Sequence, residues 1–95
     1  MTELDLTKIT GAQKLQIEVF WAPPSLQQGF RGLALAVSAK NSIGAFDILP
    51  GHENFMSEVG GEIVIHTLEG QKISFNFSRG VAEVSENQVK IYLAV

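Results

Sequence analysis

The sequence predicts an all-β protein, an antiparallel two-sheet β-sandwich of short strands with little or no helix. Apolar and polar residues alternate with a period of two along several segments, which is typical of strands with one buried and one exposed face. Turn-forming pairs that contain glycine, proline or asparagine separate these segments at short intervals. Residues 54–59 are the best helical candidate and would form a turn at most, because no stretch combines helical periodicity with start and stop signals. Short, frequent strands of this kind indicate a sandwich or a barrel.

The chain is small and has a globular composition. It contains 95 residues, of which 45% are hydrophobic and 18% are charged, so it has room for a single core. A domain of this size buries only roughly 60 to 65% of its unfolded surface, and we therefore expect a modest stability that a partner would increase. Periodicity is weak over residues 1–13, which we expect to be an extended or disordered extension, and the folded domain spans residues 14–95.

Composition also excludes several classes of function. The chain has no cysteine, which excludes a disulfide scaffold and a thiolate metal site. Its apolar runs are much shorter than the roughly 20 residues that span a bilayer, and its N-terminus lacks the pattern of a signal peptide, so we expect a cytosolic, matrix or stromal protein. The net charge is -3 and the 7 basic residues are scattered, so nucleic acid is not an expected partner.

The first alternating segment covers residues 15–20. Its buried face would consist of Leu15, Ile17 and Val19. The residues that follow are richer in apolar side chains than strict alternation allows, so some of them face outward or close the ends of the core. Clustered exposed aromatic residues mark interfaces, and the candidates here are Phe20, Trp21 and Phe30. Trp21 stands beside Pro23-Pro24 and fits an interface and a cap of the core equally well.

A rigid corner is predicted over residues 44–52, which read Gly-Ala-Phe-Asp-Ile-Leu-Pro-Gly-His. Gly44 tolerates a positive φ, and Pro50-Gly51 forms a turn whose first φ is preset and whose second is free. We interpret Gly44, Pro50 and Gly51 as structural turn residues. His52 ends the corner and would either lock it by a hydrogen bond to a local carbonyl or contact a partner.

The second half of the chain predicts a hairpin and a final strand. Strands near residues 62–68 and 71–78 would be joined at Gly70, which can take the positive φ that a tight turn between twisted strands requires. Phe75 and Phe77 share a face with Ile73 and are expected in the core. The final strand alternates over residues 88–93, and its buried face would consist of Val89, Ile91 and Leu93.

Four titratable residues could in principle converge on a metal or an acid–base pair: Asp47, His52, Glu53 and His66. The two histidines stand at no recognised ligand spacing. His66 alternates with its neighbours in a strand and is interpreted as a surface or rim residue. The chain has no glycine-rich phosphate loop and no nucleophile elbow. We therefore expect no catalytic residue, no metal site and no cofactor.

Four segments, in order, carry a resemblance to a known family. They are Ile48-Leu49-Pro50-Gly51-His52, Gly61-Glu62-Ile63-Val64-Ile65, Ser78-Arg79-Gly80-Val81-Ala82-Glu83-Val84 and Asn87-Gln88-Val89-Lys90-Ile91-Tyr92-Leu93-Ala94. In the order and spacing of these segments the chain resembles the epsilon subunit of F-type ATP synthases, in its N-terminal β-sandwich domain. The resemblance extends roughly from Leu15 to Val95.

This resemblance implies a non-catalytic rotor subunit of the central stalk, which couples proton-driven rotation of the c ring to the gamma subunit. It implies a place on the cytoplasmic face of an inner or thylakoid-type membrane, with the bacterial cytoplasm favoured over an organelle matrix or stroma. Membrane association would come only through the complex. Family members usually continue into a two-helix hairpin that can inhibit ATP hydrolysis. This sequence stops at Val95, so we expect it to lack that brake, and its start at Met1 favours a natural short form over a truncation.

The resemblance also suggests contact residues. The candidates for the c ring are Asn41, Ser42, Ile43, Gly44, Ala45 and His52. The candidates for the gamma subunit are the aromatic residues Phe20, Trp21 and Phe30. Three places depart from the common family pattern, which affects the contacts more than the fold: Ala45, Asp47 and Ser78-Arg79-Gly80-Val81.

An alternative from another class is a small β-sandwich that binds a ligand or a peptide. It would use a sheet edge or the region of Trp21 as its platform. A concave aromatic surface with a few convergent polar groups would favour this alternative, whereas a flat apolar face would favour the rotor subunit.

Overall fold

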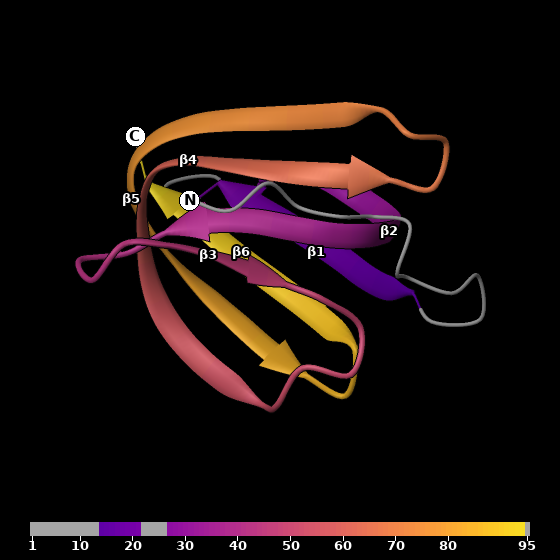
Figure 1. Ribbon diagram of the computed structural model, residues 1–95. Coiled ribbons are helices and arrows are strands. Elements are labelled where there is room, and N and C mark those ends of the chain that lie inside the picture. The colour runs from indigo at the N-terminus through magenta and orange to yellow at the C-terminus, as the bar shows by residue number, and fades with distance from the viewer. Residues whose placement is uncertain (1–13, 22–26, 95) are drawn as a thin grey trace.

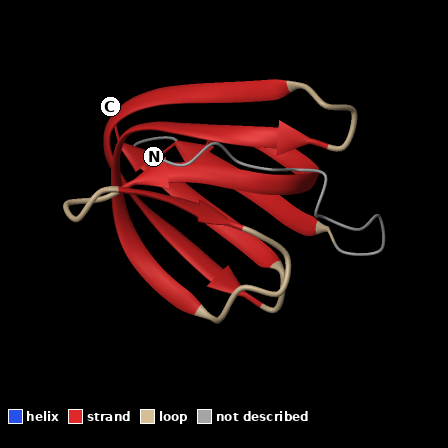
Figure 2. Ribbon diagram, in the orientation of Figure 1, coloured by secondary structure: helices blue, strands red, loops and turns tan. Residues whose placement is uncertain are grey.

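The computed structural model describes residues 14–21 and 27–94, so the predicted extension over residues 1–13 and the Pro23-Pro24 turn lie outside the described part. The described residues form strands and no helix, as the colours of Figure 2 show. The strands are β1 (Leu15–Trp21), β2 (Gln27–Lys40), β3 (Ala45–Ile48), β4 (Phe55–Thr67), β5 (Lys72–Ser85) and β6 (Gln88–Ala94). The all-β prediction is confirmed, and residues 54–59 lead into β4 instead of forming a helical turn. Within the described part, no helix is present that could cross a membrane.

One continuous hydrogen-bonded sheet contains the described strands, in the order β1-β6-β5-β4-β2-β3. β1 also pairs with β2, so the sheet closes on itself, and β3 is attached to it through β2. β1 runs parallel to β6, whereas the other pairings are antiparallel. The prediction of an antiparallel arrangement is therefore wrong for this one pair. Alternation within a strand carries no information about the direction of the strand beside it.

β4 and β5 are 13 and 14 residues long, which makes them longer than the predicted strands. Figure 1 shows both strands turning sharply near their middle, so that their two halves lie in different layers. The register between them shifts between Val59 and Gly61, and Gly61 adopts a φ of 82°. On β5 the turn passes Gly80, where a Cβ atom would collide with the carbonyl oxygen of Tyr92. Glycines at these points let a single sheet double over on itself.

The core lies between the layers and consists mainly of aliphatic side chains. The buried faces predicted for β1 and β6 are fully buried: Leu15, Ile17, Val19, Val89, Ile91 and Leu93. Ile63 and Ile65 of β4 are fully buried as well. Phe77 is buried as predicted. Phe75 and Ile73 are only partly buried and pack against the edge of the core, because their half of β5 belongs to a hairpin that projects from the body (Figure 1).

The projecting hairpin is the one that the sequence predicts. β4 ends at Thr67 and β5 begins at Lys72. Gly70 adopts a φ of 85° and donates its N–H to the carbonyl oxygen of Thr67 at 3.1 Å. The glycine therefore supplies the backbone conformation that the tight connection needs.

Candidate functional site

The tip of the β2–β3 hairpin, residues 41–44, is a tight turn that is fastened locally. The side-chain Oδ1 of Asn41 accepts hydrogen bonds from the backbone N–H of Ile43 at 2.9 Å and from that of Gly44 at 3.1 Å. Gly44 has a φ of 149°, which side-chain-bearing residues rarely adopt. Ser42 and Ala45 are exposed, and Ile43 is 94% exposed. The tip is therefore a firm projection that presents one aliphatic side chain to solvent.

The corner after β3 is fastened by contacts with its own neighbours and with the β5–β6 loop. Pro50 and Gly51 form the turn, and Gly51, with a φ of 83°, donates its N–H to Oδ1 of Asn87 at 2.7 Å. His52 Nδ1 lies 2.9 Å from the carbonyl oxygen of Glu53. The ring centroid of His52 lies 4.6 Å from that of Phe55. These contacts are those of a residue that holds the corner.

The structure does not bring all the c-ring candidates together. β3 separates the corner at His52 from the hairpin tip, and the two lie at opposite ends of this strand in Figure 1. Asn41, Ser42, Ile43 and Gly44 form the tip, and Ala45 begins the strand behind it. The tip is therefore one compact candidate surface, from which His52 is separate.

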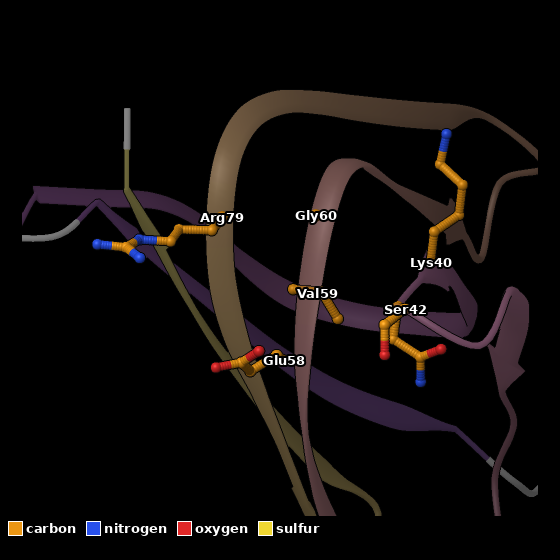
Figure 3. Close-up of a pocket in the computed structure, with 7 residues that line it drawn as sticks. Lys40, Ser42, Glu58, Val59, Gly60 and Arg79 are labelled. Carbon is orange, nitrogen blue, oxygen red and sulfur yellow. The ribbon is translucent and has the colours of Figure 1, made fainter.

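A shallow groove lies between the hairpin tip and the bend of β4 and β5 (Figure 3). Its volume is about 260 Å³, and its lining consists of Lys40, Asn41, Ser42, Glu58, Val59, Gly60 and Arg79. Figure 3 shows the side chains of Lys40 and Arg79 pointing away from each other. Because their charges do not converge, the groove suits the polar surface of a partner better than a small charged ligand.

The aromatic candidates for the gamma subunit lie on two faces of the sheet. Phe20 is stacked on Tyr92 of β6, with ring centroids 5.6 Å apart and planes at 19°. Trp21 meets Phe75 edge-on, with centroids 6.2 Å apart, and packs against the core. Phe30 also packs against the core. Since successive residues of a strand point to opposite faces, Phe20 is directed outward and Trp21 is not.

An apolar row crosses the outer face of β1, β6 and β5. The cross-strand register pairs Phe20 with Tyr92 and Tyr92 with Val81. Tyr92 is 38% exposed and Val81 is 36% exposed. Met56 of β4 is 66% exposed and lies on the same face, in the next row of residues. These four residues form the outer patch. Alternation predicts Tyr92 only as a surface residue, and its aromatic ring is the signal by which sequence reasoning could have added it to the interface candidates.

A row of alternating charge, which meets Met56 of β4 at Glu83, runs beside the row of Phe20, Tyr92 and Val81. The register of β5, β6, β1 and β2 aligns four side chains across the sheet: Glu83, Lys90, Glu18 and Arg31. An apolar centre with a polar, charged rim is the usual composition of a protein–protein interface. The face therefore has the character of a docking surface for another protein.

A partly buried polar cluster, in which His66 is the buried member, joins β2, β3 and β4 at the root of the hairpin. Ser38 donates its hydroxyl hydrogen to Oδ1 of Asp47 at 2.7 Å, and His66 Nε2 lies 2.9 Å from Ser38 Oγ. His66 is 6% exposed, so its assignment to the surface is wrong: its ring turns onto Ser38 of the neighbouring strand. Burial lowers the pKa of His66; the Lys72 ammonium acts in the same direction and the Asp47 carboxylate opposes it.

The four candidate acid–base residues separate into two places. Asp47 and His66 meet through Ser38, whereas His52 and Glu53 lie at the corner. Because the Ser38 hydroxyl gives its hydrogen to Asp47, His66 has no hydroxyl proton to remove as a general base. Among residues 14–21 and 27–94, no group of three or more histidine, cysteine, aspartate or glutamate side chains could hold a metal ion.

Comparison with known sequences identifies a family and its relatives. The family model for the ATP synthase, Delta/Epsilon chain, beta-sandwich domain matches residues 26–94. The ATP synthase epsilon chain of Corynebacterium aurimucosum is 31% identical over 62 residues, which cover 63% of this chain and 51% of the relative. That of Micrococcus luteus is 36% identical over 61 residues, which cover 63% of this chain and 67% of the relative. The chain thus spans about half the length of the first of these relatives and about two thirds of the second.

Solved structures share the fold at lower sequence identity. A chain of the Euglena gracilis mitochondrial ATP synthase, in a structure of its OSCP, F1 and c-ring, has a TM-score of 0.77 at 18% identity, covering 85% of this chain and 51% of that chain. A chain of the central stalk and c-ring of the Tetrahymena thermophila mitochondrial ATP synthase has a TM-score of 0.67 at 17% identity, covering 87% of this chain and 65% of that chain. At these identities the likeness establishes the fold alone.

Proposed function

Because the chain belongs to the family of ATP synthase delta/epsilon β-sandwich domains, we propose that it is a non-catalytic central-stalk subunit of an F-type ATP synthase. In this place it couples rotation of the c ring to the gamma subunit. The observation that carries the proposal is the extent of the family match, which takes in every strand from β2 to β6. Its similarity to bacterial epsilon chains favours a complex on the cytoplasmic face of a bacterial membrane.

The architecture suits a part that transmits torque. We infer that the bent strands work as two packed sheets, the sandwich that the sequence predicts, joined through the bends of β4 and β5. Hydrogen-bond ladders that continue from one layer into the other resist shear between them. Different strands carry the two candidate surfaces, since the outer patch belongs to β1, β6, β5 and β4 and the tip belongs to the β2–β3 hairpin. The subunit therefore has two distinct faces on one stiff body.

We assign the gamma-subunit contact to the outer patch. Phe20 is the sequence candidate that belongs to it, and its ring stacks on that of Tyr92. Aromatic residues at the centre of an interface commonly contribute most to the binding energy. Trp21 and Phe30 pack against the core and would support this face without touching the partner.

We assign the c-ring contact to the hairpin tip, residues 41–45. Ile43 is almost fully exposed there, and Asn41 holds the backbone of the turn in place around it. The groove beside the tip would admit a polar loop of the ring. In this proposal His52, at the other end of β3, stabilises the corner and does not contact the c ring.

Calorimetry with the gamma subunit from the same organism tests the proposal. We expect binding in a ratio of one to one. Tyr92→Ser should weaken it by about tenfold or more, because a central aromatic residue of an interface typically contributes more than about 1 kcal/mol. Leu68→Ser is the matched control, since Leu68 is 36% exposed, close to the 38% of Tyr92, but lies in the β4–β5 turn, away from the outer patch.

Three results are distinguishable. Binding by the parent chain and by Leu68→Ser, with loss in Tyr92→Ser, supports both the function and the surface. Equal affinities in both variants support the function but move the gamma contact elsewhere. A folded chain that does not bind the gamma subunit contradicts the proposal and brings forward the ligand- or peptide-binding sandwich.

A further inference from the structure

The partly buried cluster of Ser38, Asp47 and His66 has a defined hydrogen-bond direction. The Ser38 hydroxyl hydrogen is donated to Asp47, so the Ser38 oxygen can serve His66 only as an acceptor. His66 must therefore carry its hydrogen on Nε2. Its Nδ1 atom is then an unprotonated acceptor, and it is buried with no hydrogen-bond partner among the described residues. The neutral ring satisfies this arrangement with a single donated bond.

Protonation of His66 would disturb the cluster. A second N–H would appear on Nδ1, which is buried and faces no acceptor, and an unsatisfied buried donor is costly. The groups that face the ring are Ser38 on β2, Asp47 on β3 and Lys72 on β5, and the last of these is a cation that pairs with His66 in the strand register. The Asp47 carboxylate, on the far side of Ser38, favours protonation of His66, whereas burial and the Lys72 ammonium disfavour it. The protonated ring can satisfy its Nδ1–H only by turning that atom to solvent, and this rotation breaks its hydrogen bond with Ser38.

We propose that His66 is a pH-sensitive clamp at the root of the β2–β3 hairpin, closed when its imidazole is neutral and released when it is protonated. β3 is the strand that depends on this clamp, because it has four residues and, among the described strands, is hydrogen-bonded to β2 alone. Ile48 remains buried at its far end, so release frees the hairpin tip without unfolding the body. The inference rests on the cluster itself and stands whether or not the tip contacts a c ring.

The direction of the pH response follows from linkage. The pKa of His66 in the closed state lies below the ordinary value of 6.5, which the open hairpin approaches. Above that value both states are neutral and the clamp is fully effective. As the pH falls below it, the open state takes up the proton first, so the closed state loses stability until its own pKa is passed. The hairpin therefore loosens in mild acid.

Amide hydrogen exchange measured by NMR tests the clamp on the whole chain. Protection factors of the β3 amides are compared between about pH 7.5 and about pH 5.5, a range that spans the ordinary histidine pKa. We expect them to fall in acid, by at most about tenfold for each pH unit between the two pKa values, while those of β1 stay unchanged. The chain has 2 histidines, so His66→Gln should abolish the response and His52→Gln should retain it.

Two outcomes would overturn the proposal: a constant protection of β3 in the parent chain, or an equal acid response in His66→Gln. A third measurement needs no variant, because ¹⁵N shifts of the His66 ring report its tautomer. We expect the hydrogen on Nε2 at neutral pH, and a hydrogen on Nδ1 would contradict the cluster. Ser38→Ala should leave the β3 amides poorly protected at both pH values, and a preserved acid response in this variant would also contradict the clamp.

Discussion

The β2–β3 hairpin is formed by residues that are close together in the sequence, whereas the outer patch is formed by residues that are far apart. The hairpin is contiguous, and its tip is held by hydrogen bonds from Asn41 to residues two and three positions away. The outer patch combines side chains of β1, β4, β5 and β6, which come from both ends of the chain. Local chemistry therefore specifies the hairpin, whereas the register between distant strands specifies the patch.

The two regions also differ in how they are anchored. β3 has one hydrogen-bonded neighbour, so the hairpin depends on Ile48, on the Ser38–Asp47 bond and on the clamp at His66. The patch lies on strands of the closed part of the sheet, most of which have a neighbour on each side. Elements with few partners open at a lower free energy than the rest of a fold. The β2–β3 hairpin can thus open locally, whereas the outer patch moves only together with the closed part of the sheet.

The largest effect is expected at the anchor of the hairpin. Ile48→Ala would leave a cavity under β3, where the side chain is fully buried, and should lower the free energy of unfolding by about 3 kcal/mol. Urea unfolding measures this loss. Ile43→Ala is the control, because its side chain is 94% exposed at the tip, and it should stay within about 0.5 kcal/mol of the parent chain. Similar losses in the two variants would show that Ile48 is not the anchor.

A smaller loss is expected beneath the outer patch. Gly80→Ala would place a Cβ against the carbonyl oxygen of Tyr92, so β5 and β6 must separate, at a cost of about 2 kcal/mol. Gly60→Ala is the matched control on the neighbouring strand β4. The nearest atom to a Cβ added at Gly60 is the carbonyl oxygen of Ser78, at an ordinary van der Waals distance of 3.7 Å. Thermal unfolding of the two variants makes the comparison. A lower melting temperature in Gly60→Ala than in Gly80→Ala would contradict this account of the bend.

The smallest effect is expected at the tip itself. Asn41→Ala removes the acceptor of two backbone N–H groups, which water can partly replace, and should cost about 1 kcal/mol. Ser42→Ala changes the adjacent exposed residue and serves as the control in urea unfolding. The same Asn41→Ala variant should bind the gamma subunit as tightly as the parent chain. A weakened affinity would mean that the tip and the outer patch do not act as separate surfaces.

Much of the fold follows from local pattern. Alternation correctly places Leu15, Ile17 and Val19 in the core, because a strand with one apolar face must bury it. Gly70 correctly marks the β4–β5 hairpin, because its backbone can adopt the positive φ of the turn. The ordered segments around Ile48–His52 also lead to the right family. The first two inferences need only residues that are close together in the sequence, and the third needs only the order and spacing of segments along it.

Contacts between residues that are far apart in the chain explain where the structure corrects or refines the sequence-based expectations. His66 has the alternation of a surface residue, yet it is buried, and its ring lies against Ser38 of β2, which in turn bonds to Asp47 of β3. Phe20, Trp21 and Phe30 appear alike in the sequence, and only their strand positions separate Phe20 from the two that pack against the core.

By itself, the sequence determined that the chain is all-β, which face of most strands is apolar, where the tight turns fall and to which family the chain belongs. Only the tertiary structure decided that β6 lies parallel to β1, that β1 and β2 close the sheet, that Tyr92 and Val81 join Phe20, and that His66 is enclosed. The reason is that side-chain alternation determines the orientation of residues within one strand, whereas neighbours and register arise from contacts between residues that are far apart in the chain.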